Sequence, residues 1–174
     1  MLSYLLFLFG LNSYMNCGNI SLCGVLTIEL GIGKSVYNHT DVSVHGLWPQ
    51  TGNYGSSGCV YPGGNPDDPI PIVSCYTDTN FQKHEFLKHG ICASNSADNY
   101  FAQVCQLSSE VIPTIRDLKN EKKGIKEIAN DMEFLGYEVF SIDNTNGQLL
   151  FSVCADKENR WIFSKVKDFD EKCG

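Results

Sequence analysis

Short stretches of alternating apolar and polar residues recur along the chain, and this period of two predicts β-strands that bury one face. The first is residues 24–30, GVLTIEL, which Gly31 and Gly33 bring to an end. Further strands are predicted at residues 42–44, 137–142, 149–154 and 161–166. Residues 144–147, Asn-Thr-Asn-Gly, form a turn sequence between two of these strands.

Other stretches carry apolar residues at helical spacing. Residues 98–120 are helical in pattern but interrupted by Pro113, and a second helix is predicted at about 125–135, closed by Gly136. Residues 50–76 are rich in Gly, Pro, Asn and Ser, which predicts a long loop. This mixed order favours an α+β fold over a regular βαβ alternation. The 174 residues suit a single domain, with no internal repeat and no linker.

A third helix is predicted within residues 79–92, TNFQKHEFLKHGIC. Thr79 with Gln82 three residues later is a capping-box start, and Gly90 is a plausible stop. At about 100° per residue, the polar residues fall on one side of this helix, whereas Phe86 and Leu87 point towards a core. The polar residues are His84, Glu85, Lys88 and His89.

The polar side of this helix invites a metal interpretation, because H-E-x-x-H would be a zinc helix. Here the spacing is H-E-x-x-x-H: His89 follows His84 by five positions, which turns the second imidazole about 140° away from the first. A ligand pair needs the near alignment of i and i+4, so zinc is disfavoured. A solvated helix face remains the plain alternative, although two of the four histidines of the chain beside Glu85 and Lys88 favour a reactive site.

Composition indicates an oxidising compartment. Residues 1–16 are apolar and uncharged, and resemble a secretory signal that leaves residues 17–174 as the mature domain; a buried first strand is the alternative. Cleavage is expected between Ser13 and Cys17. Eight cysteines without a CxxC pair fit a disulfide framework, and glycosylation sequons begin at Asn19 and Asn38. No second long apolar run exists, so no membrane contact is expected of the mature protein.

The net charge excludes one class of nucleic-acid binding. It is −7 with neutral histidines, and protonating all four histidines raises it only to −3. A broad basic surface for long duplexes is therefore excluded, and any anionic ligand must be gripped locally.

A second motif follows the strand at residues 42–44, namely His45-Gly-Leu-Trp-Pro. A lone histidine on a strand is more often packed or solvated than catalytic, and Trp48 alone is usually core. Together, however, HGLWP and HEFLKHGIC resemble the two active-site signatures of the ribonuclease T2 family. The resemblance covers about residues 25–92, with a weaker continuation towards Cys154 and Cys173.

The resemblance implies an α+β fold with a central antiparallel sheet flanked by helices and stabilised by disulfides. It implies a secreted ribonuclease, or one of an acidic lumen such as a lysosome or vacuole, acting without metal or other cofactor as a monomer on single-stranded RNA. The implied catalytic residues are His45, His84, Glu85, Lys88 and His89. The implied base-binding residues are Trp48, Gln50 and Tyr54. It also implies a Cys59–Cys92 disulfide, and Cys154 and Cys173 are hypothesised to pair with each other.

Several positions depart from the family pattern. Phe86 stands where the family usually has Trp, Ile91 where it has Thr, Leu30 where Trp is common, and Gln50 where an aspartate often follows HGLWP. None of these changes removes a reactive group, so they bear on base preference more than on chemistry.

These residues suit cleavage of RNA by its own 2′-hydroxyl. One imidazole removes that proton while the other protonates the departing 5′-oxygen, which is feasible at mildly acidic pH because histidine titrates near 6.5. The resemblance suggests His89 as the base and His45 as the acid, with Lys88 offsetting charge on the phosphorane. Two rival classes are weighed against it: a catalytically inactive secreted RNA-binding or interaction protein on the same scaffold, and a metal-dependent hydrolase.

Overall fold

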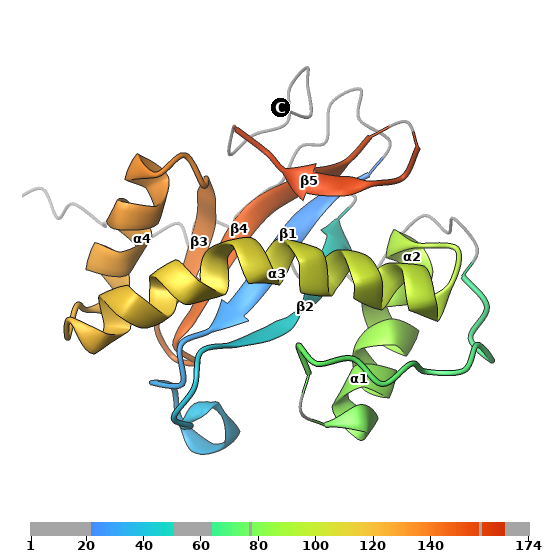
Figure 1. Cartoon of the computed structure of the whole chain (residues 1–174), viewed down its shortest axis with the longest axis horizontal. Coiled ribbons are helices and arrows are strands. Elements are labelled where there is room, and N and C mark those ends of the chain that lie inside the picture. The colour runs from blue at the N-terminus through green and yellow to red at the C-terminus, as the bar shows by residue number, and fades with distance from the viewer. Residues whose placement is uncertain (1–21, 51–63, 77, 157, 166–174) are drawn as a thin grey trace, which may run out of the picture.

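A computed structural model describes residues 22–50, 64–76, 78–156 and 158–165. Its centre is an antiparallel sheet in the order β2-β1-β4-β3, with β5 also paired to β4 (Figure 1). The strands are β1 Cys23–Glu29, β2 Ser43–Gln50, β3 Val139–Asp143, β4 Gln148–Ala155 and β5 Trp161–Phe163. The α+β class and the antiparallel sheet are therefore confirmed.

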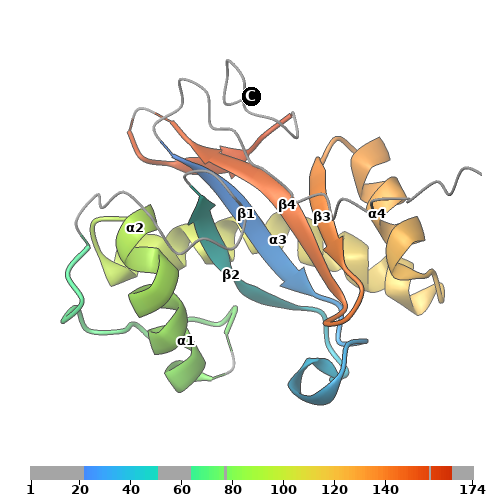
Figure 2. The same ribbon diagram turned by 180° about the vertical axis from the view of Figure 1, so that it is seen from behind.

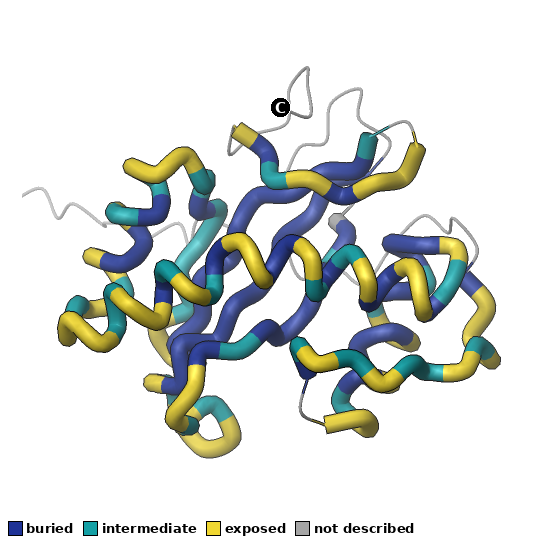
Figure 3. Tube along the Cα trace, in the orientation of Figure 1, coloured by how far each residue is buried: buried dark blue, intermediate teal, exposed yellow. Residues whose placement is uncertain are grey.

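The two central strands are buried along their whole length. Every residue of β1 and of β4 is buried, which fits their apolar sequences (Figure 3). Alternate residues serve two faces: Leu26 and Ile28 join the main core, whereas Cys23 and Val25 form a smaller cluster with Leu150. The sheet therefore separates two apolar regions.

Helices cover one face of the sheet and lie along both of its edges. Helix α3, Ala97–Asn120, crosses one face, and α4, Ile125–Phe134, lies beyond β3 (Figures 1 and 2). Beyond β2 lies a run of α1 Thr79–Glu85, the π-helical segment η2 Phe86–Gly90 and α2 Ile91–Ala93. The 3₁₀ turn η1, Ser35–Tyr37, joins β1 to β2.

Helix α3 corrects one expectation, because it runs through Pro113 without interruption. Pro113 is exposed and removes one backbone hydrogen bond, but the buried stripe continues on the core side from Val104 and Leu107 to Val111 and Ile115. Packing of this stripe against the sheet outweighs the cost of the proline.

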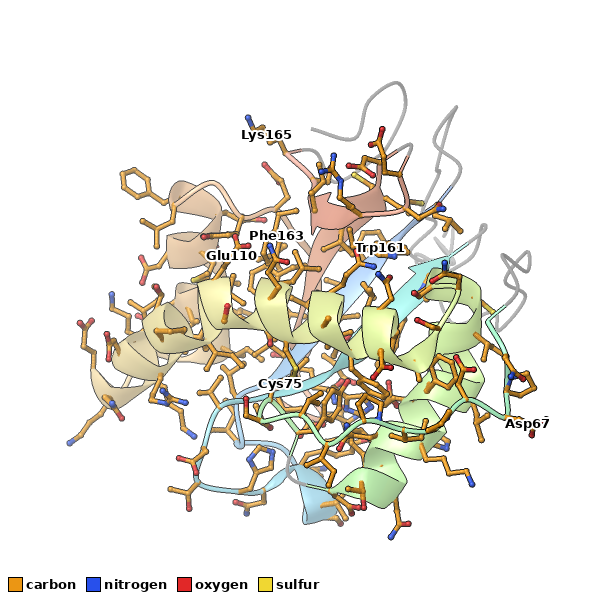
Figure 4. The ribbon with its side chains drawn as sticks, turned by 45° about the vertical axis from the view of Figure 1, so that its right-hand side comes forward. Asp67, Cys75, Glu110, Trp161, Phe163 and Lys165 are labelled. Carbon is orange, nitrogen blue, oxygen red and sulfur yellow. A yellow bond between two sulfur atoms is a disulfide. The ribbon has the colours of Figure 1, made fainter. Side chains whose placement is uncertain are left out.

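The cysteines follow the expected disulfide framework as far as they are described. Cys75 is bonded to Cys105, which ties the loop of residues 64–76 to α3 (Figure 4). Cys92 and Cys154 are each in a disulfide. Their predicted partners, Cys59 and Cys173, lie outside the described residues, as do the predicted leader and Asn19. The pairings therefore stay predictions.

Within the described ranges, no helix has the length and apolar character needed to cross a bilayer.

Candidate active site

The first motif lies in β2, where His45 occupies a β-bulge. The register with β1 pairs Thr27 with Gly46 but Ile28 with Val44, which leaves His45 as the extra residue. A bulge re-aims a side chain out of the regular alternation. The backbone around the bulge is held by two buried tyrosines: the Tyr76 hydroxyl donates to the His45 carbonyl at 2.9 Å, and the Tyr100 hydroxyl donates to the Leu47 carbonyl at 3.0 Å.

The second motif lies on the helical run beside β2, and its start differs from the prediction. Asp78, not Thr79, is the N-cap, because its carboxylate accepts from the amides of Asn80 and Phe81. Asp78 is itself a strongly preferred N-cap residue, so the N-cap predicted at Thr79 was wrong by one residue.

The end of this helix and one of its faces also differ from the prediction. Gly90 does not stop the helix, which continues to Ala93. Phe86–Gly90 forms a π turn, in which the Ile91 amide donates to the Phe86 carbonyl five residues earlier. Phe86 is buried as predicted, but Leu87 is 38% exposed, because the wider turn rotates the faces away from α-helical spacing.

Glu85 joins the two motifs. Its side chain is almost fully buried; one oxygen accepts the Trp48 indole N–H at 2.9 Å, and the other lies 3.6 Å from His45 Nε2. Gly46 makes this approach possible, because a Cβ at that position would lie 2.1 Å from Glu85 Oε2. The glycine of HGLWP is therefore required because any side chain there would displace the Glu85 carboxyl group.

Both predicted catalytic imidazoles contact one indole. The ring centroid of Trp48 lies 5.3 Å from that of His89, in a stacked arrangement, and 5.0 Å from that of His45, edge to face. The bulge and the π turn thus bring together side chains that lie 44 positions apart in sequence. An acid and a base on opposite sides of a reacting phosphate need such convergence.

The far side of His45 contacts residues that the motifs did not indicate. His45 Nδ1 forms a hydrogen bond with Glu29 Oε1 and lies 3.1 Å from the Gln148 side-chain nitrogen. The second Glu29 oxygen lies 2.8 Å from His39 Nε2. Glu29 was visible in the sequence as the only charged residue of an apolar strand, but nothing local indicated His39 or Gln148.

The surroundings of His89 favour its neutral form. Burial, reinforced by the positive charges of Lys88, His45 and His84, lowers the pKa of His89 from 6.5 to about 3. A neutral imidazole is the form that accepts a proton.

The two carboxyl groups beside His45 are shifted in opposite directions. Burial raises the pKa of Glu85, and the attraction of His45 and the Trp48 hydrogen bond offset only part of that increase. Burial would also raise the pKa of Glu29, but its hydrogen bonds and charge attraction with His45 and His39 outweigh burial and lower it. Glu29 is therefore the carboxylate that stays ionised to lower pH.

The remaining predicted site residues are less closely engaged. His84 and Lys88 are exposed on the same helical run, and in the described part of the chain neither forms a hydrogen bond or ion pair with the other motif residues. Their charges nevertheless act on Glu85 and His89. Gln50 ends β2 opposite Cys23, and Tyr54 lies outside the described residues.

No group of three potential His, Cys, Asp or Glu ligands close enough to hold a metal ion occurs among the described residues. A pocket of about 450 Å³ does lie beside the site, lined by Glu29, His39, Tyr76 and Phe81 among others.

Comparison of the chain with protein-family models, with curated proteins and with solved structures gives no match. The function is therefore inferred from the two sequence motifs and from the geometry around Trp48.

Proposed function

We propose that this protein is an endoribonuclease of the T2 type, which cleaves single-stranded RNA by transphosphorylation. The products are a 2′,3′-cyclic phosphate and then, more slowly, a 3′-phosphate. No metal or other cofactor takes part. The protein acts as a monomer, either secreted or in the lumen of an acidic compartment.

One observation carries the proposal: His45 and His89 converge on Trp48 in opposite electrostatic surroundings. His89 lies where burial and neighbouring cations favour the neutral ring. His45 has a carboxyl group at each ring nitrogen, so an imidazolium there has two ion-pair partners. A reaction that needs one neutral and one charged imidazole at the same pH is served by this difference.

The chemistry then divides between the two rings. His89 takes the proton of the 2′-hydroxyl, whose oxygen attacks the adjacent phosphorus. His45 gives its Nε2 proton to the 5′-oxygen as the bond from phosphorus to that oxygen breaks. Lys88, exposed beside His89, offsets the negative charge that develops on the phosphoryl oxygens, and His84 contacts the phosphate.

Glu85 and Trp48 hold this arrangement together. Glu85 fixes the indole through its 2.9 Å hydrogen bond and faces the proton-donating nitrogen of His45. Trp48 is half-buried, and we propose that a base of the substrate stacks on it, assisted by Gln50 and Tyr54. Stacking of this kind is tolerant of base identity, at about 1–3 kcal/mol per base.

The test uses an RNA oligonucleotide with one cleavable position, and a matched oligonucleotide with a 2′-deoxy sugar there. We expect cleavage of the first in EDTA and complete survival of the second, because the attacking group is missing. Cleavage of the deoxy substrate, or loss of activity in EDTA, would indicate attack by water on a metal and refute the mechanism. Binding of the first oligonucleotide without turnover would favour the inactive binding protein instead.

A further inference from the structure

Glu29 occupies an unusual place, because its carboxylate lies between two imidazoles. One oxygen is bonded to Nδ1 of His45, and the other lies 2.8 Å from Nε2 of His39. His45 is buried, whereas the His39 side chain is 29% exposed and lines the pocket beside the site. His45, Glu29 and His39 therefore form a continuous chain of polar contacts that runs from the buried imidazole of the site to solvent.

The hydrogen bonds of His39 determine where its protons lie. Its Nδ1 is 2.7 Å from the backbone carbonyl of Asp41, which can only accept, so Nδ1 carries a hydrogen. The 2.8 Å contact between Nε2 and Glu29 then needs one more proton between the two atoms. Glu29 has a lowered pKa, so its carboxylate is the acceptor of this hydrogen bond and His39 Nε2 is the donor.

The same reasoning fixes the tautomer of His45. The pKa of Glu29 is lowered, and its Oε1 accepts from His45 Nδ1, so Nδ1 carries a hydrogen. The side-chain nitrogen of Gln148 lies 3.1 Å from Nδ1 and 3.5 Å from the same carboxylate oxygen. Because Nδ1 donates to Glu29, the amide N–H of Gln148 is directed to the carboxylate and not to Nδ1. Nε2 is then the nitrogen that can hold or release a proton towards a substrate.

The loop that carries His39 is built to reach Glu29. Gly31 has a φ of +73°, and a Cβ there would lie 2.1 Å from the His39 carbonyl oxygen. The His39 amide donates to the Gly31 carbonyl at 3.1 Å, and Ile32 forms an isolated bridge with Asn38. The chain thus folds back immediately after β1 and returns His39 to the carboxylate at the end of that strand.

We propose that Glu29 is the positioning residue of His45, and that His39 holds Glu29 in place. Glu29 keeps Nδ1–H of His45 bonded while Nε2–H is transferred to the departing 5′-oxygen. In that step the bond from Nε2 to hydrogen breaks, the bond from oxygen to hydrogen forms, and His45 becomes neutral with Nδ1–H retained. The role resembles that of the buried carboxylate that orients the histidine of a Ser-His-Asp triad.

Other titratable or polar groups also face His45 and Glu29. They are Glu85 from α1, Tyr37 from η1, Gln148 from β4 and, across Trp48, His89 from η2. Of these, Glu85 alone places a carboxyl group beside Nε2. Removal of Glu29 is therefore expected to affect the Nδ1 side without removing that contact.

The inference rests on the proposed ribonuclease function, and the experiment separates the two. Glu29→Gln and His39→Gln are compared with Glu110→Gln, which removes the same charge from the exposed side of α3 (Figure 4). Two substrates are used: a dinucleoside phosphate, and a nucleoside 3′-(4-nitrophenyl phosphate) whose leaving group needs no proton. We expect Glu29→Gln to lower kcat on the dinucleoside phosphate on the order of 10²-fold and to leave the nitrophenyl ester almost unchanged.

Two further results are expected. His39→Gln should show the same difference between substrates with a smaller loss, and Glu110→Gln should show none. Equal losses on both substrates, or no loss on either, would overturn the positioning role.

NMR of the His45 ring gives a readout that does not depend on turnover. The wild-type protein should show a downfield Nδ1–H resonance that persists in Glu110→Gln and disappears in Glu29→Gln. If Glu29→Gln fails to fold, His39→Gln should still weaken this resonance. If the wild-type protein cleaves neither substrate, the proposed function fails, and the presence or absence of the Nδ1–H signal still decides whether Glu29 positions His45.

Discussion

At the scale of single residues, the low pKa of His89 should set the acid limit of the proposed ribonuclease activity. A general base must be deprotonated in the free enzyme, so kcat/KM should fall only as the pH approaches about 3, the pKa of His89. On the alkaline side activity should fall as the acid loses its proton. The profile is therefore a bell displaced to acidic pH.

Lys88 offers a test of this assignment, because its charge contributes to the lowered pKa of His89. In Lys88→Gln the acid limb of kcat/KM should move to higher pH, and kcat should fall about 10²-fold because charge on the phosphorane is no longer offset. Lys83→Gln, an exposed lysine of the same helical run, is the control and should alter neither. An unchanged acid limb in Lys88→Gln would show that the base is not His89.

The two tryptophans of the chain provide a matched pair for the role of Glu85. Trp48→Phe removes the indole N–H that donates a hydrogen bond to buried Glu85. Trp161→Phe removes the indole N–H that donates to the Ala93 carbonyl at 2.8 Å. Each should reduce the free energy of unfolding by about 1–3 kcal/mol, the cost of a buried acceptor left unsatisfied. Only Trp48→Phe should also lower kcat/KM on a dinucleotide. Equal kcat/KM in the two variants would place Trp48 in the core alone.

At the scale of elements, the site depends on how closely β2 and α1 approach. In Gly46→Ala the new Cβ would collide with Glu85 Oε2, so the carboxyl group must leave Trp48. A displacement of about 1 Å can cost on the order of 10²-fold in rate, and we expect a loss of that size with the far-ultraviolet circular dichroism unchanged. Gly124→Ala, at the start of α4, should retain full activity, since its Cβ would meet only Glu127. Full activity of Gly46→Ala would contradict this geometry.

Pro113 reduces the stability of helix α3, and its replacement should restore that stability. Pro113 lies on its exposed side and has no N–H to donate to the preceding turn. Pro113→Ala should therefore raise the free energy of unfolding by roughly 1–2 kcal/mol, the helical gain less the entropy that proline removes from the unfolded chain. Urea unfolding measures the change, and kcat should stay as in the wild type. A lower stability would mean that the ring of Pro113 packs more favourably than its exposure indicates.

The elements that were predicted correctly are those with a local signal. Alternation in GVLTIEL marks β1, and the glycine after residue 135 marks the end of α4, where Gly136 has a φ of +91°. The strand forms where it was predicted, but it is buried on both faces and not on one, because the neighbouring elements cover both sides of it. The bulge at His45 and the π turn at Phe86–Gly90 have no such signal, because both arise from packing between distant segments. For the same reason the motifs indicated Glu85 and His89 but not Glu29 and His39, which meet only through the return of the loop after β1.

At the scale of the whole molecule, the site makes stability depend on pH. His89 has a folded pKa of about 3 against 6.5 ordinarily, so below pH 6.5 the unfolded chain takes up a proton that the folded chain refuses. The lowered pKa of Glu29 acts in the same direction at lower pH, because its stabilisation is lost as pH falls through its folded pKa. The raised pKa of Glu85 opposes both, since its contribution is lost as pH rises. Cross-links such as Cys75–Cys105, which closes a separation of 30 residues, offset such losses by about 2–4 kcal/mol.

Comparison of the wild-type protein with His89→Gln isolates the histidine from the opposing carboxyl groups. Urea unfolding at pH 7 and at pH 4 gives the free energy of unfolding of each. Between these values the wild-type protein should lose more than the variant, by at most about 1.4 kcal/mol for each pH unit below 6.5. His84→Gln, which changes an exposed histidine of the same helical run, should stay much closer to the wild-type curve, because burial and not the charge of His84 is the main cause of the lowered pKa of His89. If His89→Gln follows the wild-type curve as well, His89 titrates alike in the folded and unfolded chains, and the base of the proposed reaction has no lowered pKa.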